Sequence, residues 1–160
     1  MQKFYIIVRN DIPTMNIGKM AAQVSHCTTK LASEIDLFML QRDGFQKETR
    51  EWLNDENIGT TMVMEGYGDD IKEFFSTVKK EFPKLYTNKV IDETYPFIVP
   101  LDVARCLNKS VTVDWDSVDE NGNVKCTRKE WTCSGLFFEG TKEDNRKLRD
   151  LMTTFNINLM

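Results

Sequence analysis

The sequence predicts an α/β fold in which helices cover both faces of a central sheet. Short segments rich in β-branched and aromatic residues alternate with longer segments in which apolar residues recur at helical spacing. Helices placed between strands favour a sheet whose neighbouring strands are parallel. We therefore expect one three-layer α/β/α domain over residues 1–160, with a mixed, largely parallel four-stranded sheet and a β-hairpin inserted at 101–131.

The chain opens with a predicted strand at residues 3–9, a short loop and a helix that begins near Lys19. Gln23 and His26 share a sector of about 60° with Lys19 on this helix. Lys30 falls in the same sector. A second stripe, turned by about 120°, holds residues expected to pack against the sheet: Met20, Val24, Cys27, Thr28, Leu31 and Ile35. The helix thus carries an ammonium, an amide and the only imidazole of the chain beside its buried face.

The next elements continue the alternation of helix and strand. The first helix is expected to reach about Arg42, and residues 44–55 form a second predicted helix. Residues 59–66 form the second predicted strand, and residues 84–92 form the third. A further helix lies between these two strands, which is the order typical of parallel sheets.

Polar residues mark the starts of two helices. Asp69 or Asp70 can cap the helix between the second and third strands, which ends near Phe82 because Pro83 follows. Thr141, followed by an acidic first turn, can cap the last helix.

Residues 101–131 interrupt the alternation. Two strand-like stretches flank Asn121-Gly122, a dipeptide that is a strong signal for a hairpin turn. The hairpin follows the presumed site loop, so it is either an arm that contacts the substrate or a surface hairpin without a role in function. Residues 132–139 then form the last predicted core strand.

Composition narrows the classes of function. A net charge of −4 argues against non-specific nucleic-acid binding over the whole surface, although a few Lys or Arg on one side suffice for phosphate contacts. The chain has one histidine and four cysteines without C-x-x-C spacing, so we expect reduced thiols and no metal site. No apolar run approaches the roughly 18 residues of a membrane span, and the N-terminus lacks a signal-peptide pattern, so we expect a cytoplasmic protein.

Gly18-Lys19 at a helix start is similar to part of a phosphate-binding P-loop. That motif requires a glycine where Pro13 stands and a Ser or Thr where Met20 stands, so it fails at both positions. Hydrolysis of nucleoside triphosphates is therefore rejected. Free backbone N–H groups and the positive end of the helix dipole still predict a site for a phosphate or a developing oxyanion at Gly18 and Lys19.

A longer signature surrounds this dipeptide. A strand ending in Arg-Asn-Asp, a short loop and the stretch GKMAAQVSH resemble the signature of the peptidyl-tRNA hydrolase 2 family of archaea and eukaryotes. The matching residues are Arg9, Asn10, Asp11, Gly18, Lys19, Ala21, Ala22, Gln23, Ser25 and His26. The resemblance implies hydrolysis of the ester that joins a peptide to the terminal ribose of tRNA, with peptidyl-tRNA as partner and no metal or other cofactor. The oligomeric state stays open, with a homodimer as one alternative.

The resemblance also implies roles for single residues. Lys19 would stabilise an oxyanion or a phosphate, Asp92 would orient or deprotonate the water or tune Lys19, and His26 would transfer a proton or position the substrate. The remaining candidates would bind the substrate or support the site through hydrogen bonds: Arg9, Asp11, Gly18, Gln23 and Thr94. Asp11 and Asp92 both end predicted strands beside the start of the first helix, so one cleft could hold the set.

The stretch after Asp92 departs from the family pattern. The family has Ala-Gly after the aspartate and a threonine two residues after that, where this chain has Glu93-Thr94 and then Pro96. The alternative to a hydrolase is therefore a catalytically inactive relative that keeps the fold to bind RNA or a protein. For Arg9 and Asp11, the alternative is a surface ion pair beside a turn.

Overall fold

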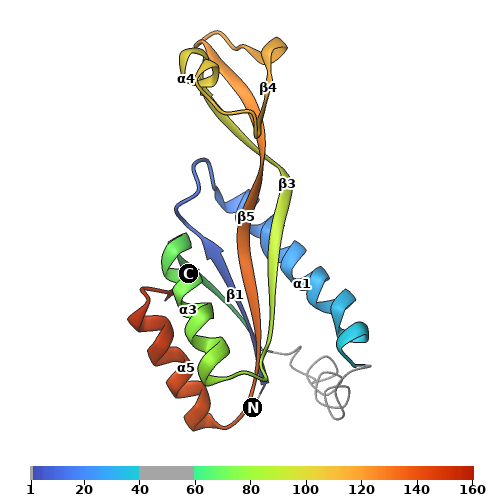
Figure 1. The fold of residues 1–160 in the computed structure, drawn as a ribbon, viewed down its shortest axis with the longest axis vertical. Helices are drawn as coiled ribbons and strands as arrows, with labels where there is room; N and C mark the ends of the chain where they lie inside the picture. Colours follow the sequence, from blue (N-terminus) through green and yellow to red (C-terminus); the bar gives the residue numbers. More distant parts are fainter. Residues whose placement is uncertain (1, 40–59) are drawn as a thin grey trace.

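The computed structural model describes residues 2–39 and 60–160, and Figure 1 shows their arrangement. The helix predicted at 44–55, the predicted end of the first helix near Arg42 and the first residue of the strand predicted at 59–66 lie outside the described residues. No helix in the described ranges is both long enough and apolar enough to cross a membrane.

A mixed sheet forms the centre of the fold, so the predicted α/β class is confirmed. The strand order is β3-β5-β1-β2-β6, and β4 pairs with β5 outside this path. The strands are β1 (Gln2–Arg9), β2 (Thr61–Gly66), β3 (Tyr86–Pro100), β4 (Val111–Asp114), β5 (Asn123–Glu139) and β6 (Asn158–Leu159).

The prediction of four largely parallel strands is wrong. The described sheet has six strands; β1–β2 is a parallel pair, whereas β1–β5, β3–β5, β4–β5 and β2–β6 are antiparallel. The error arises because β5 enters the sheet between β1 and β3 from the C-terminal part of the chain. β1 and β3 point in the same direction, as the strand–helix order predicts, but they are not neighbours.

Helices cover both faces of the lower part of the sheet as drawn in Figure 1. α1 (Ile17–Met39) lies on one face, and α3 (Gly68–Glu81) and α5 (Lys142–Thr154) lie on the other. The upper halves of β3 and β5 extend beyond these helices, together with β4 and the short helix α4 (Leu101–Arg105). The predicted three-layer arrangement therefore holds only for the lower part of the molecule.

β1 is buried on both faces, and its alternating side chains divide the core. Its even-numbered apolar residues pack with Cys27 and Leu31 of α1, as the predicted stripe requires. Its odd-numbered residues Tyr5 and Ile7 pack against α3 and α5. The Tyr5 hydroxyl donates a 2.7 Å hydrogen bond to Asn145 of α5, which satisfies the buried phenol. Apolar residues on both faces are typical of a strand with helices on either side.

The predicted hairpin at 101–131 is part of a longer arm. β3 and β5 stay paired beyond Tyr95 and Arg128, and the connection between them holds α4, the 3₁₀ helix η1 (Trp115–Ser117) and β4. We call residues 95–128 the arm. β4 and β5 do form the expected antiparallel pair, but β5 is continuous with the core strand predicted to begin at residue 132.

The arm has a small core and an irregular tip. Phe97, Ala104, Val124 and Cys126 are buried together in it. Asn121-Gly122 does not form a two-residue hairpin turn, because it ends the longer connection that follows β4. Gly122 has φ +74°, a conformation that favours glycine.

The starts of α3 and α5 test the predicted caps. Thr141 caps α5 in a capping box, in which its hydroxyl accepts from the Asp144 N–H and the Asp144 carboxylate accepts from the Thr141 N–H. The prediction for α3 is wrong, because its N-cap residue is Tyr67, which makes no side-chain cap bond. Asp69 and Asp70 lie in the first turn instead, where the helix dipole favours carboxylates.

Candidate active site

The polar flank of α1 lies along β3. The Lys19 ammonium donates a 2.8 Å hydrogen bond to the Pro96 carbonyl oxygen, and the Gln23 amide nitrogen donates a 3.1 Å bond to a carboxylate oxygen of Asp92. Lys19 and Gln23 are about one turn apart, so they reach neighbouring points of β3 from the same face of α1. The structure thus brings three of the predicted site residues together.

Gln23 is buried, although the sequence places it on a polar flank. It is 3% exposed, and its amide oxygen accepts a 2.7 Å hydrogen bond from the hydroxyl of Thr132, which is 0% exposed. One end of the amide is therefore used by β3 and the other by β5. Leaving such buried groups without partners costs about 1–3 kcal/mol each, so the two bonds fix the Gln23 side chain.

Two irregularities in the β3–β5 pairing create this arrangement. The register shift between Val90 and Ile91 leaves Thr132 as an extra residue on β5, and its hydroxyl turns toward α1. A second shift, between Asp92 and Tyr95, leaves an extra residue on β3. β-Bulges bend a strand and re-aim its side chains, so the two shifts direct polar groups from both strands to the same end of α1.

Asp92 lies within β3 and not at its end. The predicted strand stops at Asp92, whereas β3 continues to Pro100 because it stays paired with β5. One Asp92 carboxylate oxygen accepts from Gln23, and the other accepts a 3.0 Å hydrogen bond from the backbone N–H of Thr94. Glu93-Thr94, the departure from the family pattern, therefore supplies a backbone donor to the carboxylate. Thr94 itself is exposed.

The Lys19 ammonium lies where the loop before α1 meets the arm. Besides its bond to Pro96, it donates a 3.2 Å hydrogen bond to the Thr14 hydroxyl, and it lies 5.0 Å from the ring centroid of Tyr95. Its partners are neutral oxygens, and it forms no ion pair with Asp92. An ammonium has three N–H donors, so one remains for a ligand.

A cavity of about 590 Å³ opens beside Lys19. Thr14 and Asn16 of the loop line one side of it, and side chains of the arm line the other. The arm residues include two cross-strand rows, Pro96–Thr127–Thr112 and Ile98–Lys125–Asp114. The arm therefore forms a wall of the cavity that contains Lys19.

Arg9 and Asp11 form a bidentate ion pair in which both N···O distances are 2.9 Å. Arg9 also donates a 2.8 Å bond to Glu130 of β5, and Asp11 accepts a 3.2 Å bond from the N–H of Gly68 at the start of α3. The hydrogen bonds from Arg9 lower the pKa of Asp11. A Cβ atom at Gly68 would lie 2.7 Å from the Arg9 Nε, so this network needs glycine there. The pair ties β1, β5 and α3 together.

The part of the chain that builds this site matches a known family. Residues 2–95, more than half of the chain, match the family described as peptidyl-tRNA hydrolase PTH2. The chain belongs to this family. The PTH2 match contains Lys19, Gln23 and Asp92 and ends at Tyr95, where the arm begins. No curated protein sequence matches the chain.

Asn16 caps α1 at the start of the PTH2 signature helix. Its side-chain oxygen accepts a 3.0 Å hydrogen bond from the Lys19 N–H, and its carbonyl oxygen accepts from the Met20 N–H. The N–H group predicted to be free at Lys19 is therefore occupied. Gly18 is exposed, and a Cβ atom there would meet only the Asn16 oxygen, at an ordinary contact distance of 3.5 Å. Packing within the chain therefore does not require glycine at position 18.

His26 is not joined to the other PTH2 site residues. It is exposed on α1, and its imidazole has no hydrogen-bond partner among the residues that the structure describes. It lies on the same flank as Lys19, two turns further along the helix. In residues 2–39 and 60–160, no three His, Cys, Asp or Glu side chains gather as metal ligands.

Three residues at the site have no signal in the sequence that we used. Thr132 and Thr14 look like ordinary polar residues of a strand and a loop, and bulges leave no local sequence mark. Tyr95 is 1% exposed beside Lys19, and burial raises the pKa of its hydroxyl. Pro96 offered a usable clue, because a proline inside a strand indicates an edge strand, which β3 is.

Proposed function

We propose that the protein hydrolyses the ester bond of peptidyl-tRNA in the cytoplasm, releasing a peptide and free tRNA, with residues 1–160 acting as one domain. Membership of the PTH2 family supports this substrate class. The observation that carries the proposal is the delivery of Lys19 and Gln23 from one face of α1 to β3. It sets an ammonium on the same stretch of strand as the carboxylate of Asp92.

Asp92 would orient the attacking water. Each oxygen of an ionised carboxylate can accept more than one hydrogen bond, so the bonds from Gln23 and Thr94 leave acceptor sites for a water molecule. Because these two donors hold the carboxylate, the water would be fixed relative to the ester carbon. Asp92 would accept a proton from this water as it attacks.

Lys19 would stabilise the oxyanion of the tetrahedral intermediate. Its bonds to Pro96 and Thr14 hold the ammonium at the wall of the cavity and leave one N–H for the ligand. A fixed positive group near the developing oxyanion lowers the barrier to ester cleavage. The volume of about 590 Å³ is within the usual range for a ligand pocket.

The remaining candidates would act around the substrate. His26, exposed on the α1 flank, would transfer a proton or position the tRNA. Gly18 and Thr94, both exposed, would contact the substrate directly. Arg9 and Asp11 are engaged with each other, so they would support binding by holding the end of β1 in place.

The arm would contact the peptide or the terminal nucleotide of the substrate. This role is supported by the cavity, whose walls combine Lys19 with arm residues of mixed chemistry, such as Ile98, Asp114 and Lys125. The family match stops at the start of the arm, so the arm would adapt a shared site to the substrate of this protein.

Cleavage of a purified N-blocked aminoacyl-tRNA tests the proposed function. The wild-type protein should release free tRNA, and Lys19→Ala should slow the release by at least about 100-fold, the usual effect of removing an oxyanion donor. Lys30→Ala, on the same helix flank, is the matched control and should cleave like the wild type. Absence of release by the wild-type protein while it still binds tRNA would contradict the proposal.

A further inference from the structure

A second cavity, of about 460 Å³, lies on the face of the sheet opposite α1. It runs between α3 and the lower half of β3, and its charged and aromatic lining residues are Lys72, Phe75, Lys79, Lys89 and Trp131. We call it the α3–β3 groove. It is open because β3 is an edge strand and the helix α3 packs nearer the middle of the sheet, on β1.

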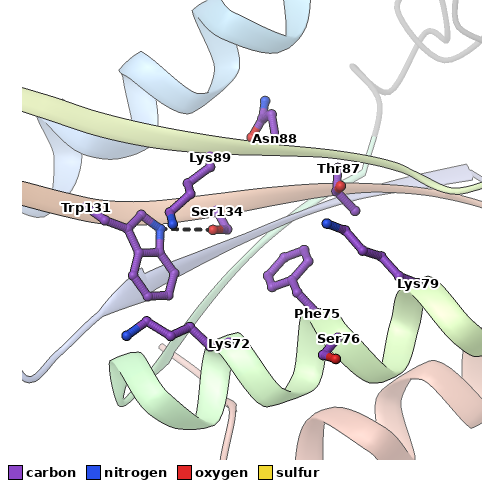
Figure 2. A pocket seen from close by; sticks show the side chains of 9 residues that line it. All are labelled: Lys72, Phe75, Ser76, Lys79, Thr87, Asn88, Lys89, Trp131 and Ser134. Atoms are coloured by element: carbon purple, nitrogen blue, oxygen red, sulfur yellow. Dashed lines mark hydrogen bonds between the residues drawn. The ribbon is translucent and has the colours of Figure 1, made fainter.

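Trp131 organises one end of the groove. Its indole N–H donates 3.1 Å hydrogen bonds to the Cys133 carbonyl and the Ser134 hydroxyl, which fix the ring. The Lys89 ammonium lies 4.6 Å from the ring centroid and the Lys72 ammonium 5.7 Å. Figure 2 shows both lysines beside Trp131, with Lys79 at the other end of the groove near Thr87. The ring thus gathers two like charges that repel each other, and cation–π attraction offsets only about 0.5–1 kcal/mol for each exposed cation.

The groove has no carboxylate in its lining. Lys72 forms an ion pair of 3.3 Å with Asp69, whose side chain is 95% exposed, and such surface pairs contribute little. Lys79 and Lys89 form no ion pair with any residue that the structure describes. In a chain of net charge −4, three lysines without a counterion in their groove are a local feature and not a consequence of overall basicity.

We propose that the α3–β3 groove binds the phosphate backbone of the RNA part of the substrate; this inference rests on the proposed function. Lys72 and Lys79 are seven residues apart on α3, about 10 Å along its axis, so linked phosphates match their spacing better than one small anion does. Lysines along a groove with aromatic side chains are the usual elements of a site for single-stranded nucleic acid.

The position of the groove fits a strand whose esterified end lies at the candidate active site. Trp131 pairs with Ile91, and the next pair along the two strands is Asp92 with Glu130. The groove therefore begins one residue pair away from the carboxylate proposed to orient the water. Because β3 is the edge of the sheet, an RNA strand can pass around it from the groove to the α1 side.

Charge removal in the groove tests this inference. The variant Lys72→Gln/Lys79→Gln/Lys89→Gln is compared with Lys109→Gln/Lys142→Gln/Lys147→Gln, which removes the same charge from exposed positions elsewhere. Binding of deacylated tRNA is measured by fluorescence anisotropy at several salt concentrations. The groove variant should bind at least about tenfold more weakly, with a salt slope smaller by about 2, as expected for three lost phosphate contacts. Equal losses in both variants, or no loss in the groove variant, would overturn the proposal.

Competition and a small substrate separate the remaining outcomes. Polyuridylate should displace tRNA from the wild-type protein far better than polyglutamate or inorganic phosphate; equal displacement by either of these would overturn the assignment to RNA. An N-blocked aminoacyl ester of adenosine lacks the RNA strand, so the groove variant should cleave it at the wild-type rate while its KM for the tRNA substrate rises. If the wild-type protein cleaves neither substrate, the proposed hydrolase activity fails, and the binding comparison alone decides the role of the groove.

Discussion

Gln23 links three elements through one buried side chain. Its amide joins α1 to Asp92 on β3 and to Thr132 on β5. Gln23→Leu removes both bonds and leaves the buried Thr132 hydroxyl without its partner. We expect the free energy of unfolding in urea to fall by about 1–3 kcal/mol, and ester cleavage to slow because Asp92 loses one of its two donors.

A double-mutant cycle shows whether the Gln23–Thr132 bond causes this loss. Thr132→Val keeps the shape of the side chain and removes its hydroxyl. Its cost in unfolding free energy should be smaller in the Gln23→Leu protein than in the wild type, because the hydroxyl has already lost its acceptor. Equal costs in the two backgrounds would show that the two side chains are not coupled.

The Arg9–Asp11 ion pair predicts a dependence of stability on pH. Hydrogen bonds from Arg9 lower the pKa of Asp11 in the folded protein, so the pair stabilises the fold above the unfolded pKa of about 3.9 and loses this contribution as the pH falls through the lower, folded value. Asp11→Asn should therefore reduce the free energy of unfolding by about 1 kcal/mol at pH 7 and by much less near pH 3. Urea denaturation at both pH values measures the difference. A difference that stays the same at pH 3 would contradict the ion-pair account.

The sequence places some site residues well and others not at all. Helical spacing puts Lys19 and Gln23 on one flank of α1, and that flank does meet β3. The burial of Gln23 could not be predicted, because it depends on Thr132, a residue more than one hundred positions away that a bulge turns toward it. Local patterns carry no information about a bulge of this kind.

At the scale of elements, the arm is the feature that separates this chain from the segment shared with its family. Pro100 and Asn123 are directly opposite each other in the β3–β5 register, so a two-residue Asn-Gly turn can replace residues 101–122. This deletion removes β4 and its part of the cavity wall. We expect the KM for peptidyl-tRNA to change several-fold while the helical part of the fold is kept, as measured by steady-state cleavage and circular dichroism.

Point variants control for damage to the shortened arm. Lys125→Gln changes a lining residue of the Lys19 cavity and should shift KM, whereas Lys109→Gln makes the same charge change elsewhere on the arm and should not. If the deletion and Lys125→Gln both leave the kinetic constants unchanged, the arm is a surface hairpin without a role in catalysis.

Element predictions succeed where the signal is local. The capping box of α5 follows from Thr141 and the acidic turn after it, and the α1 stripe follows from helical spacing. The continuation of β3 past Asp92 is missed because Glu93 and Thr94 resemble a loop, and only the pairing with β5 keeps them in a strand. The position of Asp92 in the site therefore depends on a long-range contact.

At the scale of the whole molecule, the α/β class follows from the alternation of elements, whereas the strand order does not. Inserting β5 between β1 and β3 turns an expected parallel neighbourhood into two antiparallel ones. It also places Thr132 and Glu130 next to the candidate site. Net charge is similarly uninformative at this scale, because an overall charge of −4 coexists with a groove lined by three lysines.

One measurement tests the central claim, that Asp92 and the α1 flank form a hydrolytic site. Asp92→Asn keeps the size of the side chain and removes its charge. Cleavage of N-blocked aminoacyl-tRNA is followed under single-turnover conditions, with binding of deacylated tRNA measured in parallel. We predict a loss of at least about 100-fold in the cleavage rate with unchanged tRNA binding. A cleavage rate close to that of the wild type would contradict the claim and move the chemistry to another part of the protein.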